Sequence, residues 1–122
     1  MKKISIVIPV FNEAENIPRL IERITAVAGQ NGFSYEIIAV DDGSTDETAK
    51  ALKQAAGRNK DLKVISFSRN YGQTAALSAG ISHASGDIII PMDADLENDP
   101  ADIPILLKKL NATERQLPKM KS

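Results

Sequence analysis

Four short apolar runs, rich in β-branched residues, constrain what this chain can fold into. They span residues 4–10, 36–41, 63–68 and 87–92. The apolar residues in each run are nearly continuous and do not alternate with polar ones, which is typical of β-strands covered on both faces. The runs therefore predict four buried strands.

Helical patterns lie between these runs. The first has an apolar face at helical spacing, formed by Ile17, Leu20, Ile21, Ile24 and Val27. We expect this helix to end before Gly29. A second helix is predicted to begin at a capping box made of Ser44 and Glu47 and to stop near Gly57. A third pattern covers residues 72–84.

Strand and helix alternate along the chain, which predicts an α/β fold: a parallel, Rossmann-like sheet with helices on both faces. The chain has 122 residues, 43% of them hydrophobic, enough for one compact domain. We assign this domain to residues 1–112, with a short last helix over residues 102–110. Residues 113–122 show no periodicity and are expected to form a disordered tail.

Polar motifs follow each predicted strand, where parallel sheets bind their ligands. They read PVFNEAE, DDGSTD, SRNYGQ and DADLE in chain order. Asp41, at the end of the second strand, either belongs to an ordinary turn or accepts hydrogen bonds from a base or ribose. From the residues alone the two interpretations are equally supported.

Acidic residues recur at every second position after the fourth strand, at Asp93, Asp95 and Glu97. On an extended segment these side chains point the same way, and close carboxylates repel one another. An all-oxygen cluster suits a hard cation such as Mg²⁺ or Mn²⁺. The alternative is a solvated acidic loop, in which Asp99 caps a helix.

Composition excludes several classes of protein. Fifteen basic and sixteen acidic residues give a net charge of -1, which predicts no nucleic-acid partner, and no cysteine is present. The segment after the first strand lacks the glycines of a dinucleotide-binding oxidoreductase. The third strand ends in FSRN, without the aspartate of a receiver domain.

Together the motifs resemble a known family. SIVIPVFNEAENI, VDDGSTDET, SRNYGQTAALSAGISHASGD and MDADLENDP are similar to the N-terminal half of inverting family-two glycosyltransferases. They are most similar to the branch of dolichyl- and polyprenyl-phosphate sugar synthases. The resemblance covers residues 4 to about 110 and implies a GT-A fold that binds a UDP- or GDP-linked sugar.

The resemblance also implies roles for single residues. Pro9, Phe11 and Glu13 would line the nucleoside pocket. Asp41 would contact the base, and Asp93 would meet the ribose or the metal side of the nucleotide. No catalytic residue is assigned.

Asp95 would be the principal ligand of Mg²⁺ or Mn²⁺, with Glu97 as a further ligand where this branch often has glutamine. In the full-length family the sugar passes to a lipid-phosphate acceptor, which is already an anion and needs little activation. The resemblance implies a cytoplasmic protein, placed at the cytoplasmic face of the membrane in full-length members.

Family members continue well beyond this length, so we expect the chain to be a truncated copy that binds a nucleotide-sugar without transferring the sugar. Its exposed sheet edge predicts a homo-oligomer. A non-catalytic remnant, which only binds nucleotide or self-associates, remains the alternative.

Overall fold

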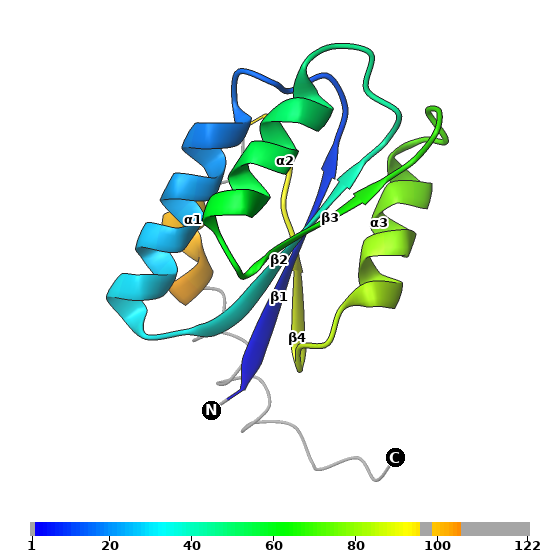
Figure 1. Cartoon of the computed structure of the whole chain (residues 1–122). Coiled ribbons are helices and arrows are strands. Elements are labelled where there is room, and N and C mark those ends of the chain that lie inside the picture. The colour runs from blue at the N-terminus through cyan, green and yellow to red at the C-terminus, as the bar shows by residue number, and fades with distance from the viewer. Residues whose placement is uncertain (1, 96–98, 106–122) are drawn as a thin grey trace, which may run out of the picture.

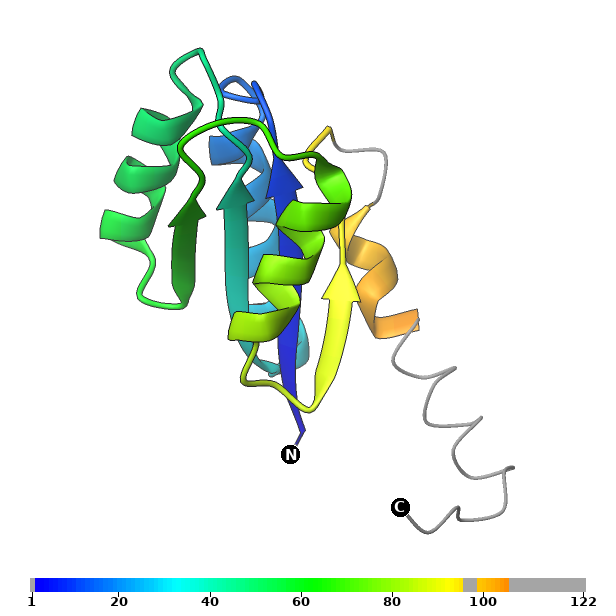
Figure 2. The same cartoon turned by 90° about the vertical axis from the view of Figure 1, so that its right-hand side faces the viewer.

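The computed structural model describes residues 2–95 and 99–105. Its centre is a four-stranded sheet in the order β3-β2-β1-β4, with all neighbours parallel. Figure 2 shows the strands side by side with their carboxyl ends at the same edge. The strands are β1 (Lys3–Val10), β2 (Ser34–Asp41), β3 (Leu62–Ser66) and β4 (Ile88–Pro91). The predicted parallel α/β fold is confirmed.

The helices form a layer on each side of this sheet (Figure 1). On one face lie α1 (Ile17–Asn31), α2 (Thr48–Arg58) and a short 3-10 helix, η1 (Pro100–Asp102). The opposite face carries α3 (Gln73–His83). Helices on both faces explain why the strand sequences are apolar at successive positions instead of every second one.

Alternate residues of β2 supply the two cores. Ile37 and Ala39 belong to the larger core under α1 and α2, whereas Ile38 and Val40 belong to the smaller core under α3. All four side chains are at most 1% exposed. The smaller core is thin because α3 is built from small residues. A Cβ placed on Gly80 would lie 2.3 Å from Val7 Cγ1, so the helix sits directly against the sheet.

Two predicted helix boundaries are wrong. The helix α1 continues through Gly29, and its C-cap is Gly32, whose φ of 65° lets its N–H donate to the Ala28 carbonyl. Ser44 and Glu47 form no capping box, because Ser44 Oγ accepts a hydrogen bond from the Asn12 backbone at 3.0 Å. A long-range loop contact therefore replaces the local cap that the sequence pattern favours.

Asp99 caps η1, as expected, by accepting a hydrogen bond from the Ala101 backbone at 3.0 Å. It also pairs with Arg23 Nη2 at 2.7 Å, which joins η1 to α1. Residues 103–105 continue as helix. The remainder of the helix expected over 102–110 and the expected tail over 113–122 lie outside the described residues. Within the described part, no helix has the length and apolar character needed to cross a membrane.

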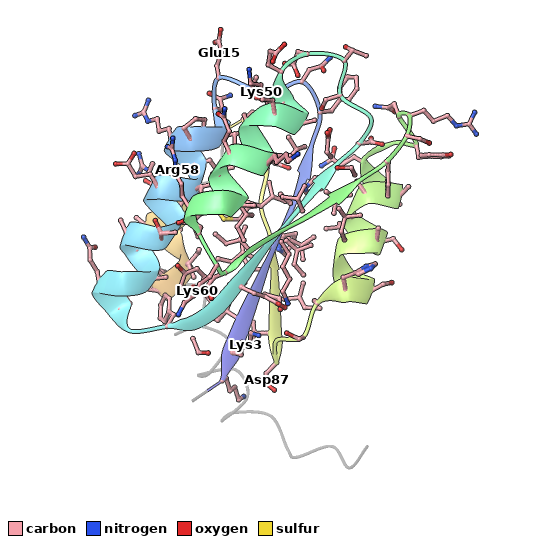
Figure 3. The ribbon with its side chains drawn as sticks, viewed as in Figure 1. Lys3, Glu15, Lys50, Arg58, Lys60 and Asp87 are labelled. Atoms are coloured by element: carbon pink, nitrogen blue, oxygen red, sulfur yellow. The ribbon has the colours of Figure 1, made fainter. Side chains whose placement is uncertain are left out.

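A buried carboxylate joins the amino ends of the strands, at the edge where Figure 3 places Lys3 and Asp87. Glu36, 2% exposed, accepts hydrogen bonds from Ser5 Oγ at 2.6 Å, Lys63 Nζ at 2.9 Å and the Ser85 backbone at 2.7 Å. Burial alone raises the pKa of Glu36, but these hydrogen bonds outweigh it and lower the pKa from 4.5 to about 2.

Candidate functional site

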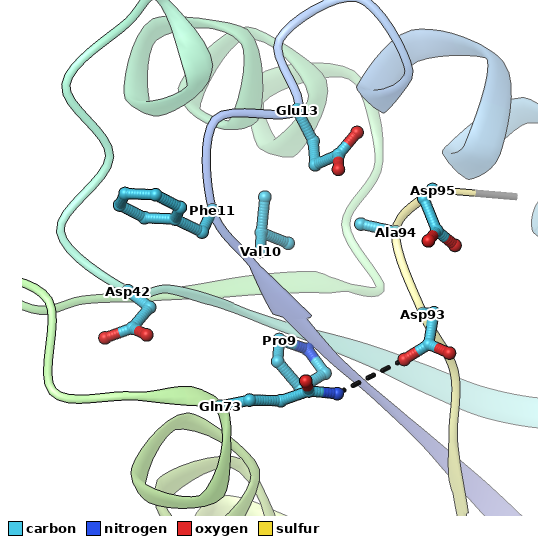
Figure 4. Close-up of a pocket in the computed structure, with 9 residues that line it drawn as sticks. All are labelled: Pro9, Val10, Phe11, Glu13, Asp42, Gln73, Asp93, Ala94 and Asp95. Carbon is cyan, nitrogen blue, oxygen red and sulfur yellow. Dashed lines mark hydrogen bonds between the residues drawn. The ribbon is translucent and has the colours of Figure 1, made fainter.

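A cavity of about 310 Å³ opens at the carboxyl ends of the strands. Parallel sheets place ligands at this edge, because the loops that follow successive strands converge there. Figure 4 shows the lining side chains, with Asp93 and Asp95 on one side and Phe11 and Asp42 on the other. The lining consists of Pro9, Val10, Phe11, Glu13, Asp42, Gln73, Asp93, Ala94 and Asp95.

The end of β1 supplies the wall between these two sides. Pro9 lies within the strand, and Phe11 follows it with 43% of its surface exposed. An aromatic ring exposed to this extent inside a cavity offers a flat apolar face to a ligand. Glu13 is half-buried, and its Oε2 accepts a hydrogen bond from Asn16 Nδ2 at 2.7 Å. All three predicted nucleoside-pocket residues therefore line one cavity.

The two aspartates after β2 have different surroundings. Asp41 is 3% exposed, does not line the cavity, and accepts a hydrogen bond from the Ser44 backbone at 3.1 Å. Asp42 is equally buried and does line it. Its two carboxylate oxygens accept hydrogen bonds from the backbones of Tyr71 at 2.7 Å and Gly72 at 3.1 Å. The structure thus brings Asp42, rather than the predicted Asp41, to the cavity wall.

Asp93 and Asp95 both reach the cavity, although not along an extended segment as we expected. The chain forms a turn at residues 94–95, and Ala94 within this turn is buried in the larger core. Gln73, at the start of α3, donates from Nε2 to Asp93 Oδ1 at 3.3 Å. Glu97, the third predicted metal ligand, lies outside the described residues.

The described charged residues that line the cavity are all acidic. Four carboxylates line it, from Glu13, Asp42, Asp93 and Asp95, and none of its described lining residues is basic. Asp42 accepts two backbone hydrogen bonds, and Asp93 accepts one from the Gln73 side chain. Oxygen donors of this kind suit Mg²⁺ or Mn²⁺. In residues 2–95 and 99–105, no group of three or more potential metal ligands occurs, and Asp93 and Asp95 are the two carboxylates on the β4 side of the cavity.

Sequence reasoning missed four lining residues, of which Val10 and Ala94 are apolar and Asp42 and Gln73 are polar. The signal for Asp42 was present in the repeated aspartate of DDGS, but adjacent identical residues do not reveal which one faces the cavity. Gln73 follows the glycine that ends the loop after β3, in the motif YGQ. A polar residue at the first position of a helix that begins at the ligand edge is a usable signal.

Comparison with known proteins identifies relatives of this chain. The family model described as glycosyl transferase family 2 matches residues 5–119. An undecaprenyl-phosphate 4-deoxy-4-formamido-L-arabinose transferase from Salmonella paratyphi A is 50% identical over 111 residues. The match covers 89% of this chain and 34% of the relative, so the chain spans about a third of the length of the curated relatives it matches.

Solved structures of similar fold include complexes with Mn²⁺. A mannosyltransferase from Pyrobaculum calidifontis, in complex with GDP-Man and Mn²⁺, is 28% identical with a TM-score of 0.70 over 77% of this chain and 28% of its own. A glucosyl-3-phosphoglycerate synthase from Mycobacterium tuberculosis, in complex with Mn²⁺, UDP and glucosyl-3-phosphoglycerate, is 28% identical with a TM-score of 0.72, over 89% of this chain and 39% of its own.

Proposed function

Since this chain belongs to glycosyl transferase family 2, we propose that its cavity binds the nucleoside diphosphate of an activated sugar donor. The parallel sheet and its helices match the GT-A fold of its structural neighbours. The base and ribose would occupy the side of the cavity near Pro9 and Phe11, where the Phe11 ring offers an apolar face. The family resemblance implies a contact between Asp41 and the base, but Asp42 is the aspartate that lines the cavity, so we propose Asp42 for this contact.

The acidic lining of the cavity is the observation that supports this proposal, because the proposed ligand, a diphosphate, is itself an anion. A diphosphate would be repelled by Asp93 and Asp95 unless a cation lay between them. We propose that these two carboxylates hold Mg²⁺ or Mn²⁺, with Glu97 as a further ligand. The cation, when bound, neutralises the charge that develops on the departing diphosphate. The neighbours solved with Mn²⁺ support this assignment.

The chain spans about a third of the length of its curated relative, so the sugar acceptor that we propose is that of a whole protein of this kind. The curated relative is named for transfer to undecaprenyl phosphate, which supports a polyprenyl phosphate as the acceptor here. A phosphate is already an anion at neutral pH, so it can attack the sugar without a general base. We place this reaction at the cytoplasmic face of a membrane, where a lipid phosphate and a nucleotide-sugar can meet.

Titration calorimetry tests the proposal with the chain as it stands. We expect UDP or GDP to bind in the presence of Mn²⁺ and to lose binding when EDTA is added. Asp95→Ala should abolish metal-dependent binding with little change in the thermal unfolding midpoint, because Asp95 is exposed. Glu22→Ala, which removes an equal charge from the exposed surface of α1, serves as the control. Equal affinity with Mn²⁺ and with EDTA would remove the metal from the proposal.

A further inference from the structure

Asn12 has an unusual backbone in the loop between β1 and α1. Its φ of 51° lies in the left-handed region, and within the described residues no other residue except glycine has a positive φ. Asparagine tolerates this conformation better than most residues, but the backbone still needs support from its surroundings. Asn12 stands between Phe11 and Glu13, two residues that line the cavity, and is not itself part of the lining.

The side chain of Asn12 reaches across to the loop between β2 and α2. Its Oδ1 accepts hydrogen bonds from the backbones of Thr45 at 2.8 Å and Asp46 at 3.3 Å. Its Nδ2 donates to Thr45 Oγ1 at 3.3 Å, and its own backbone N–H donates to Ser44 Oγ at 3.0 Å. These four hydrogen bonds join segments more than thirty residues apart in the sequence.

The loop held by Asn12 also supports the other side of the cavity. Within it, Asp42 fixes the backbone of Tyr71 and Gly72 just before α3. A Cβ on Gly43 would lie 2.2 Å from the Arg69 carbonyl carbon, so this loop and the one after β3 are in close backbone contact. The β2–α2 loop therefore connects the walls of the cavity. Asn12 makes most of the hydrogen bonds that attach the β1–α1 loop to it, and the Glu13 backbone adds one to Thr48 Oγ1 at 2.9 Å.

We propose that Asn12 is a positioning residue for nucleotide binding. It clamps the β1–α1 loop to the β2–α2 loop and thereby holds Phe11 and Glu13 at the cavity before the ligand arrives. This inference rests on the proposed function, because it assigns Phe11 and Glu13 to the nucleotide. Because the loop is already ordered before binding, the free energy of binding carries a smaller entropic cost. The clamp therefore contributes to affinity without touching the ligand.

Asn12→Gly tests the clamp. Glycine adopts a φ of 51° without strain, so the variant should fold, but it lacks the side-chain hydrogen bonds to Thr45 and Asp46. With Mn²⁺ present, we expect the dissociation constant for UDP or GDP to rise about tenfold. Hydrogen exchange of the Thr45 amide should become faster. The affinity for Mn²⁺ alone, followed by paramagnetic broadening of the Asp93 and Asp95 amide signals, should stay the same.

Asn59→Gly is the matched control, since it removes one asparagine hydrogen bond, to the Ala55 carbonyl, at the opposite edge of the sheet. It should leave nucleotide affinity unchanged. If Asn12→Gly binds nucleotide as tightly as the unaltered chain, or if both variants lose affinity equally, the positioning role is overturned and the proposed function survives. If the unaltered chain binds neither nucleotide, the proposed function itself fails and the positioning role falls with it.

Discussion

At the scale of the residue, Gly43 shows how closely the ligand-edge loops are packed. Its φ is 69°, and an added Cβ would lie between 2.2 and 2.6 Å from backbone atoms of Arg69 and Asn70. Backbone atoms cannot rotate away as the end of a side chain can. Any larger residue at this position must therefore push the loop after β3 away from the loop after β2.

We expect Gly43→Ala to lower the free energy of unfolding by about 3 kcal/mol. Left-handed strain accounts for about 1–2 kcal/mol of this loss, and displacement of the loop for the rest. Gly32→Ala is a matched control, because Gly32 has a similar φ of 65° but nothing within 4 Å of the added Cβ. Urea denaturation of both variants measures the difference. Equal losses would mean that the contact with Arg69 and Asn70 carries no energy.

The residue scale also shows what the sequence could predict of the site. Five predicted residues line the cavity, namely Pro9, Phe11, Glu13, Asp93 and Asp95. The family resemblance implied Pro9, Phe11 and Glu13, whereas the acidic spacing after the fourth strand pointed to Asp93 and Asp95. The choice between Asp41 and Asp42 could not be predicted, because it depends on where β2 stops and on the hydrogen bonds that Tyr71 and Gly72 donate.

At the scale of the element, the strands were predicted within two residues at either end, whereas helix ends were less predictable. The extent of a buried strand can be predicted from its own sequence, because its successive apolar side chains pack into the cores on both faces of the sheet. A helix end depends on partners elsewhere in the chain. Ser44 Oγ accepts a hydrogen bond from the Asn12 backbone instead of capping α2. Asp46 accepts a hydrogen bond from the backbone of Thr48, the first residue of α2, at 2.9 Å.

The amino edge of the sheet gives a prediction about acid stability. Glu36 in β2 bonds to Ser5 in β1, to Lys63 in β3 and to Ser85 ahead of β4, so one carboxylate joins all the strands. Its folded pKa of about 2 lies below the ordinary 4.5. The stabilisation is therefore fully present above pH 4.5 and is lost as the pH falls towards 2. At neutral pH the shift corresponds to about 3 kcal/mol.

Glu36→Gln should therefore be less stable than the unaltered chain at pH 7, and the gap should close as the pH approaches 2. Thermal unfolding followed by circular dichroism across this pH range measures it. The control is Glu22→Gln, an exposed change on α1, whose stability should follow that of the unaltered chain. A stability gap that stays constant from pH 7 to pH 2 would show that Glu36 acts through packing alone.

At the scale of the whole molecule, the two faces of the sheet are unequally covered. Two helices and η1 pack on one face, and α3 alone covers the other (Figure 1). Ile88 and Ile90 of β4 pack with the larger core, so Ile89 between them points to the face of α3. Ile89 is 39% exposed, and Ile81 of α3 is 44% exposed. Apolar surface therefore remains beside β4 within the described part.

This surface and the sheet edges lead us to expect self-association. In the described sheet, β3 and β4 are the outer strands, and outer strands present unpaired backbone groups that recruit other chains. Ile89 lies on one of these strands, so apolar burial and strand pairing would act at the same place.

Light scattering should report a mean mass that rises with concentration. Ile89→Lys should reduce this rise, because a charge on an edge strand opposes pairing. Ala49→Lys, which adds the same charge to the exposed surface of α2, should not. A constant monomer mass over the whole concentration range would contradict association, and equal effects of the two lysines would assign it to net charge instead of to β4.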